Sequence, residues 1–199
     1  MIFLDVNIIY EDCYIIIVSK FTNMKIHPSI DKENLTLLNF LLYNYPYLVI
    51  LPRCGILHRL DKNTTGLLLI AKTLFSYNYL LNQFKNRNIM RAYVTIVNGS
   101  FVSGGVICVP VVKKFGKKVC MSVVKEGVNA ITYYRVLRKF SNFTFLKLLL
   151  ETGKTHQIRV HMQYISHNIL GDTLYNKIGI NDFFDHKLKY IFKRIKRQI

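Results

Sequence analysis

Acidic residues are scarce in this sequence. Its 199 residues include 11 Asp and Glu against 28 Lys and Arg, which gives a formal net charge of +17. A small domain normally carries a net charge of only about 2 to 8. An excess of this size favours a polyanionic partner, most often a nucleic acid. A drift in amino-acid usage toward Lys, Ile, Asn, Tyr and Phe is the alternative explanation.

Long apolar runs are also absent. A membrane-spanning helix needs about 20 apolar residues, and the longest apolar region, residues 37–51, is interrupted by Asn39, Asn44 and Pro46. The N-terminal segment lacks the basic region and the small-residue cleavage site of a signal peptide. The 4 cysteines form no CxxC pair and fit a reducing compartment. We therefore expect a cytoplasmic protein without a membrane partner, and we expect it to be a monomer.

Several common catalytic motifs are missing. The sequence contains no GxGxxG, no GxxxxGK[ST], no HExxH and no GxSxG. Dinucleotide redox chemistry, nucleotide hydrolysis and zinc proteolysis are therefore disfavoured. The spacing of His156, His161 and His167 matches no zinc template, so we expect no bound metal.

The hydrophobic patterns predict more strands than helices. A sequence that is 51% hydrophobic can bury a core, and it shows no repeat and no linker, which favours one domain over residues 1–199. Helical spacing predicts one helix over 34–45, one after a cap at Thr73 and one after a cap at Thr155. Apolar runs predict strands over 14–19, 66–71, 91–97, 106–112, 118–123, 130–137 and 143–151. We expect an α+β fold with a mixed, mostly antiparallel sheet and flanking helices.

A first polar cluster, HRLDKNTTG, occupies residues 58–66. Asp61 stands between the cations Arg59 and Lys62, and nearby positive charge favours the ionised carboxylate that a nucleophile or general base requires. The guanidinium of Arg59 can contact phosphate or stack on a base. Taken alone, the cluster is equally well explained as a solvated turn with a local ion pair.

A second polar cluster, TGKTHQIRVH, occupies residues 152–161. A glycine loop leads into a predicted helix start that carries Lys154, His156 and Arg159. Backbone N–H groups at a helix start, together with cations, form an anion site. The anion is either a phosphate or Asp61 itself.

The two clusters together closely resemble the motifs of the RluA-type pseudouridine synthases. HRLDKNTTGLLLIAK is similar to that family's catalytic-aspartate motif, and TGKTHQIRVH with its continuation MQYISHNILGDTLY is similar to its third motif. Weaker matches lie in the right order at residues 18–28 and 91–99. Within the family, the segments before the two motifs look most like the RluD branch, which modifies large-subunit ribosomal RNA.

The resemblance implies a pseudouridine synthase fold and an RNA uridine isomerase that needs no cofactor. It makes Asp61 the essential carboxylate, and Arg159 would pair with it. Tyr93 would pack against the target base, and Arg59 would fill the stack that the extruded base leaves. RNA contacts are expected from Lys62, Lys154 and His156. Without the motifs, Tyr93 would be assigned to the core and Arg159 to a phosphate contact.

The sequence departs from the family at both ends. The resemblance begins near Ile8, so we expect no N-terminal S4 domain, and the chain stops where the family continues into further strands. Residues 186–199 read as a basic amphipathic helix that suits RNA phosphates or a membrane surface, and the RNA motifs favour RNA. A frayed, solvated tail explains the segment equally well. Ribosomal RNA is the expected substrate. The alternatives are a transfer RNA substrate for the same chemistry, or an RNA-binding or ribosome-assembly protein that has lost catalysis.

Overall fold

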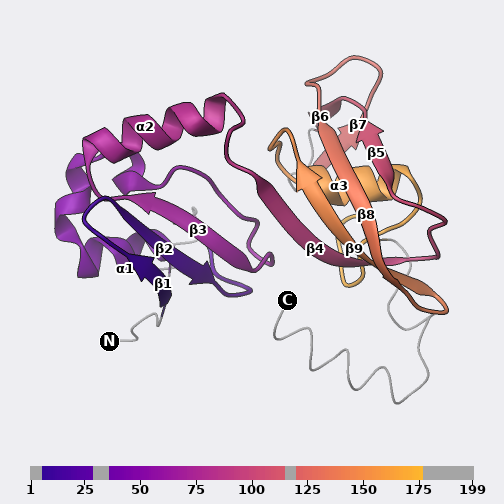
Figure 1. Ribbon diagram of the computed structural model, residues 1–199, viewed down its shortest axis with the longest axis horizontal. Coiled ribbons are helices and arrows are strands. Elements are labelled where there is room, and N and C mark those ends of the chain that lie inside the picture. The colour runs from indigo at the N-terminus through magenta and orange to yellow at the C-terminus, as the bar shows by residue number, and fades with distance from the viewer. Residues whose placement is uncertain (1–5, 29–35, 115–119, 177–199) are drawn as a thin grey trace. The chain divides into compact units, whose positions relative to one another are not determined.

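The computed structural model describes residues 6–28, 36–114 and 120–176 (Figure 1). The chain divides into two compact units, a first that holds the described residues up to Asn88 and a second that begins at Ile89. That the chain forms one domain stays a prediction. The basic segment predicted over 186–199 lies outside the described residues.

The first unit contains a three-stranded antiparallel sheet in the order β1-β2-β3. The strands are β1 (Asn7–Glu11), β2 (Ile15–Lys20) and β3 (Gly66–Ala71). The helices α1 (Leu37–Asn44) and α2 (Leu74–Lys85) lie on opposite sides of this sheet (Figure 1). Helix α2 packs Tyr77 and Phe84 against Leu69 and Ala71, which share one face of β3.

Both helices of the first unit begin at side-chain caps. Thr36 Oγ1 accepts the backbone N–H of Asn39, so α1 starts at Leu37. Thr73 and Ser76 form the reciprocal capping box at α2, which confirms the cap predicted at Thr73. The first two residues of the helix predicted over 34–45 lie outside the described residues.

Two short 3₁₀ turns, η1 (Pro46–Ile50) and η2 (Pro52–Gly55), connect α1 to the Asp61 segment. Gly55 has φ +77°, and a Cβ at this position would lie 2.1 Å from the carbonyl oxygen of Ala71. Only glycine fits such an approach of two backbones. The next residue, Ile56, then bridges to Ile70 of β3, which directs the chain toward Asp61.

The second unit is built on a four-stranded antiparallel sheet in the order β4-β9-β8-β5. Helix α3 (Gln157–Tyr164) covers one face of this sheet, and the core lies between them. The strands are β4 (Arg91–Asn98), β5 (Gly105–Cys108), β8 (Ile131–Lys139) and β9 (Phe143–Leu150), and a separate hairpin is formed by β6 (Val111–Lys114) and β7 (Cys120–Val123). The core side chains are Val97, Phe101, Ile107, Leu146, Leu148 and Met162. The α+β prediction with mostly antiparallel pairing is confirmed.

Two local predictions were wrong, and one strand was missed. The strand predicted over 106–112 is two strands, β5 and β6, because Pro110 has no backbone N–H to donate to a ladder. Strand β1 was missed because all of its residues are exposed, so no burial pattern marks it. Thr155 does not cap α3, which begins one residue later than such a cap would place it, after His156 in the left-handed region at φ 54°.

Candidate active site

Asp61 lies in a turn that directly precedes β3. The backbone N–H of Thr64 donates to the carbonyl oxygen of Asp61 over 3.0 Å, which closes the turn. Asp61 is half-buried, whereas Arg59 and Lys62 are exposed. The turn therefore places the half-buried Asp61 between two exposed cations that are close in sequence.

Lys20 is a residue of this site that sequence reasoning missed. Its side chain is fully buried at the end of β2, and Nζ donates to the carbonyl oxygens of Phe21 over 2.9 Å and Lys62 over 2.8 Å. Burial lowers the pKa of Lys20 to about 8, and the negative charge of Asp61 acts in the opposite direction. Lys20 thus holds the backbone next to Asp61 and places positive charge near the carboxylate. The signal in the sequence was its alternation with Ile16 and Val18, which puts it on the buried face of β2.

The remaining polar residues of the first unit support the turn or add charge to it. His58 Nε2 accepts the backbone N–H of Leu69 over 3.0 Å, which ties the segment to β3. Burial lowers the pKa of His27, and the positive charges of Arg53 and Arg59 lower it further. The exposed Arg53 and Arg59 thus place positive charge along the segment that leads to Asp61, which suits a phosphate-rich ligand.

In the second unit, the polar side chains of the TGKTHQIRVH motif form a buried network that ties the start of α3 to β8. Gln157 is its centre: Oε1 accepts from Thr152 Oγ1 and from the backbone N–H of Lys154, and Nε2 donates to Thr132 Oγ1. His161 is fully buried, with Nδ1 2.9 Å from Thr132 Oγ1 and Nε2 3.2 Å from the carbonyl oxygen of Val109. Burial lowers the pKa of His161, and the bond to the Val109 carbonyl opposes that shift.

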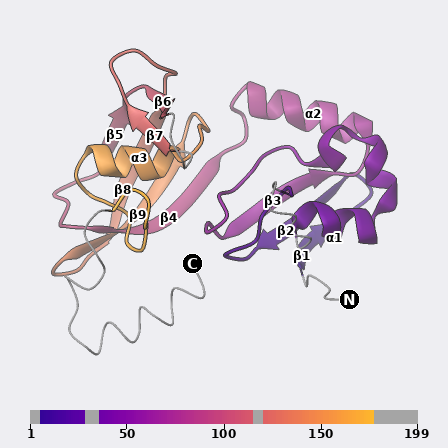
Figure 2. The same ribbon diagram turned by 180° about the vertical axis from the view of Figure 1, so that it is seen from behind.

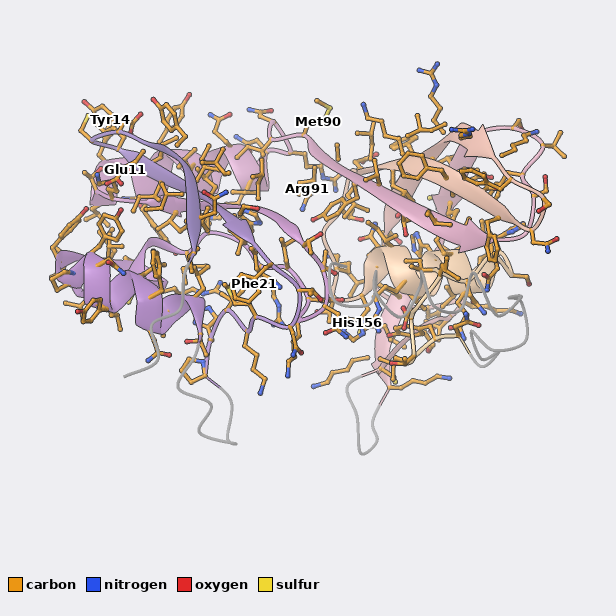
Figure 3. The ribbon with its side chains drawn as sticks, turned by 90° about the horizontal axis from the view of Figure 1, so that it is seen from below. Glu11, Tyr14, Phe21, Met90, Arg91 and His156 are labelled. Atoms are coloured by element: carbon orange, nitrogen blue, oxygen red, sulfur yellow. The ribbon has the colours of Figure 1, made fainter. Side chains whose placement is uncertain are left out.

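This network changes the expectation of an anion site at the start of α3. The backbone N–H of Lys154 is already bonded to Gln157, so it serves the fold of the loop. The side chain of Lys154 is exposed. His156, labelled in Figure 3, is half-buried, and its Nδ1 lies 2.8 Å from the hydroxyl of Tyr175. Anion contact at this loop stays a prediction that rests on side chains rather than on backbone donors.

Arg159 is held by two residues that sequence reasoning did not single out. Its Nε and Nη2 donate to the carboxylate of Asp172 over 2.7 and 2.9 Å, a bidentate pair. The guanidinium carbon also lies 4.9 Å from the ring centroid of Tyr175. Burial raises the pKa of Asp172, but the bonds from Arg159 and from the backbone N–H groups of Leu174 and Tyr175 outweigh it, so the pKa is lowered. The orientation of Arg159 is thus fixed within the second unit.

Tyr93 is half-buried on β4 and packs against the core on the side of α3. Two residues earlier, Arg91 Nη2 donates to the carbonyl oxygen of Glu151 over 2.8 Å, and Figure 3 labels Arg91 at the start of the strand. A Cβ on Gly153 would lie 2.2 Å from Arg91 Nη1, so the glycine of the motif makes room for this guanidinium. The start of β4 and the TGK loop are therefore one packed substructure.

The predicted site residues fall in both units. Asp61, Arg59 and Lys62 belong to the first unit, whereas Tyr93, Lys154, His156 and Arg159 belong to the second. Within the described residues, no group of three or more His, Cys, Asp or Glu side chains gathers as a metal site. No described helix is long and apolar enough to cross a membrane.

A family model described as RNA pseudouridylate synthase matches residues 14–164. The chain belongs to this family. The match spans the Asp61 turn, the strand of Tyr93 and the TGKTHQIRVH motif, so the pseudouridine synthase resemblance found in the sequence is confirmed.

Individual pseudouridine synthases agree with this assignment. The chain is 44% identical to ribosomal large subunit pseudouridine synthase D of Buchnera aphidicola subsp. Schizaphis graminum over 186 residues, which is 92% of this chain and 59% of that protein. It is 41% identical to the protein of the same name in Haemophilus influenzae over 198 residues, 96% of this chain and 60% of that one. The chain therefore spans about three fifths of the length of these curated relatives.

Solved structures show the same fold. Human RNA pseudouridylate synthase domain containing 1 aligns with a TM-score of 0.72 at 23% identity, covering 87% of this chain and 71% of that chain. Human RNA pseudouridylate synthase domain containing 4 aligns with the same TM-score at 22% identity, covering 96% and 78%.

Proposed function

We propose that this chain is an RNA pseudouridine synthase that isomerises specific uridines of large-subunit ribosomal RNA. The observation that carries the proposal is the Asp61 turn, where the half-buried Asp61 is flanked by cations and the buried Lys20 holds the carbonyl oxygen of the next residue. Membership of the pseudouridine synthase family and the names of the relatives support the reaction and the choice of RNA.

The reaction needs a single essential carboxylate, and we assign that role to Asp61. The N1–C1′ bond of uridine breaks, a C5–C1′ bond forms, N1 gains a proton and C5 loses one. Atoms balance within the nucleotide, so no cofactor is consumed. A carboxylate can act in such a reaction as nucleophile or as general base.

The other site residues take supporting roles in the proposal. Arg159, oriented by Asp172, is the cation that the family motif assigns to Asp61, and Tyr93 packs against the target base. Extruding that base from folded RNA costs a few kcal/mol. Arg59 can offset part of this cost by stacking in the vacated space, which is worth about 1–3 kcal/mol. Lys62, Lys154 and His156 contact the RNA backbone.

The test is to map pseudouridine by its carbodiimide adduct in unmodified large-subunit ribosomal RNA after incubation with the purified chain. New sites are expected with the wild-type chain and none with Asp61→Asn. Glu126→Gln, an exposed loop carboxylate, is the matched control and should keep full activity. RNA affinity of Asp61→Asn should stay within about threefold of wild type, because the substitution removes chemistry rather than contacts.

Two outcomes would contradict the proposal. Modification of transfer RNA but not of ribosomal RNA would keep the chemistry and overturn the substrate. If a folded sample binds both RNAs but modifies neither, the result would favour an RNA-binding or ribosome-assembly protein. Activity retained by Asp61→Asn would remove the catalytic assignment itself.

We further infer that the chain works as a cytoplasmic monomer without metal. Light scattering on the purified chain tests the monomer, and turnover in excess EDTA tests the independence from metal. A dimeric mass, or activity lost in EDTA and restored by a divalent cation, would contradict the respective inference.

A further inference from the structure

The sheet of the second unit has one face that no described helix covers. Helix α3 packs against the face that carries Leu146 and Leu148, and it lies behind the sheet in Figure 1 and in front of it in Figure 2. The strand register places the alternate side chains on the opposite face, here called the outer face. Its three cross-strand rows are Ala92, Leu149, Tyr133 and Val106; Val94, Lys147 and Arg135; and Ile96, Phe145 and Arg138.

The middle row sets two cations directly opposite each other. Lys147 on β9 pairs in register with Arg135 on β8, and both side chains are exposed. No carboxylate among the described residues forms an ion pair with either of them. Like charges on directly opposed residues, whose Cβ atoms are about 5 Å apart, destabilise a sheet. A bound anion would relieve this repulsion, and Arg138 in the next row adds a third positive charge.

Aromatic and apolar side chains surround these cations. Tyr133 is 45% exposed and Val94 62% exposed, although both belong to the sheet of a folded unit. The hydroxyl of Tyr133 donates to Glu151 Oε2 over 2.9 Å, beyond the end of β9, which orients the ring on the face. Phe145 lies between Ile96 and Arg138 in the third row. Aromatic rings interleaved with cations are the arrangement that stacks bases while pairing their phosphates.

We propose that the outer face binds a single-stranded segment of RNA. Phosphates contact Lys147 and Arg135, and bases stack on Tyr133 and Phe145. An open antiparallel sheet with accessible aromatic side chains suits unpaired bases, because each base can lie flat on a ring. Tyr133 is exposed and Phe145 is half-buried. The charge of the face is complementary to RNA, in keeping with the net charge of +17. This surface goes beyond the proposed uridine site, because neither stacking nor phosphate contact requires a uridine.

The experiment measures fluorescence anisotropy of a labelled 12-nucleotide oligoadenylate with the full chain. This probe contains no uridine and cannot be isomerised, so the comparison of variants at the outer face with their control decides where it binds. Lys147→Glu is the informative variant, because it replaces the like-charge pair with an ion pair to Arg135 and should unfold at no lower temperature than wild type. Lys125→Glu, in an exposed loop, makes the same change in net charge and is the matched control.

Lys147→Glu should weaken oligoadenylate binding about tenfold and reduce the slope of log affinity against log salt by about 0.7. Lys125→Glu should change affinity by less than about threefold. Tyr133→Leu keeps an apolar strand residue but removes the ring, and it should weaken binding about fivefold or more. Asp61→Asn should bind oligoadenylate as wild type does.

Equal affinities of Lys147→Glu and Lys125→Glu would overturn the proposal, as would an unchanged affinity of Tyr133→Leu. If Lys147→Glu weakened binding of polyglutamate but not of oligoadenylate, the face would be a protein-docking surface and the RNA assignment would be wrong. Loss of pseudouridine formation in Asp61→Asn with intact oligoadenylate binding would leave both proposals standing, so the two can fail separately.

Discussion

The ammonium nitrogen of Lys20 lies 2.8 Å from the carbonyl oxygen of Lys62, a residue 42 positions away in the sequence. This bond joins the end of a buried strand to the residue that follows Asp61. Removing the ammonium group leaves the Phe21 and Lys62 carbonyl oxygens without this partner. A hydrogen bond that involves a charged group contributes about 1.5–3 kcal/mol to stability.

Lys20→Met should therefore lower the rate of pseudouridine formation about tenfold or more, with RNA affinity within about threefold of wild type. Single-turnover rates and anisotropy on the same RNA separate the two quantities. Lys85→Met, on the last turn of α2, is the control for loss of a lysine and should leave both unchanged. An unchanged rate in Lys20→Met would show that the Asp61 turn holds its geometry without this lysine.

The activity should also fall as the pH rises above about 8. Lys20 has a pKa lowered to about 8, so it is cationic below that pH and loses its charge above it. Loss of the charge removes positive potential from the vicinity of Asp61. A pH–rate profile of the wild-type chain should show this inflection, and the profile of Lys20→Met should lack it. The same inflection in both proteins would assign it to another group.

Asp172→Asn should disorient Arg159 and destabilise the second unit. The carboxylate is almost fully buried and accepts two hydrogen bonds from Arg159. The amide of asparagine can accept only one of these bonds, and it carries no negative charge to balance the guanidinium. We expect a loss of about 1–3 kcal/mol in unfolding free energy and about a tenfold slower isomerisation. Chemical denaturation and single-turnover assays measure these effects. A slower rate at full stability would point to a direct role of Asp172 in the reaction.

Stability should decline as the pH falls below the ordinary histidine pKa of about 6.5. The pKa of His161 is lowered in the folded state, so the unfolded chain binds its proton first. The stability that neutral His161 provides is therefore complete above pH 6.5 and is lost as the pH falls through the folded-state pKa. Denaturation of wild type and His161→Gln at pH 8 and pH 5 tests this point. The variant should be less stable at pH 8 and lose less on acidification; equal losses would exclude His161 as the cause.

Binding to single-stranded RNA should weaken steeply with salt. Each phosphate that the chain neutralises contributes about 0.7 to the slope of log affinity against log salt. A chain with a net charge of +17 is expected to show a slope of several such increments. Titrations at a series of salt concentrations measure this slope. An affinity independent of salt would show that phosphate contact does not explain the positive charge of the chain.

The sequence predicted much of the fold and only part of the site, because some features have local sequence signals and others do not. Strand β3 and the cap at Thr73 were predictable because strict apolar runs and a capping box are local signals. The split at Pro110 was also readable from the sequence, since proline lacks the backbone N–H that a strand ladder needs. The left-handed backbone of His156 was not, because no local pattern marks it, and in the fold its ring bonds the hydroxyl of Tyr175. Asp61 and Arg159 could be assigned roles from the motifs. Lys20 and Asp172 also lie within the matched segments, but their roles depend on partners 42 and 13 residues away, which the sequence does not identify.

The network around Gln157 distinguishes the TGKTHQIRVH motif from the Asp61 motif, because the loss of the network would affect folding whereas the loss of Asp61 would affect the reaction. Thr152 donates to Gln157, and Gln157 and His161 both bond Thr132 inside the second unit. A related chain that had lost the isomerisation would still need these bonds to fold. The presence of Thr152, Gln157 and His161 is therefore explained by folding alone. Asp61 is the position at which an active enzyme and a protein that keeps the fold without the activity would first differ.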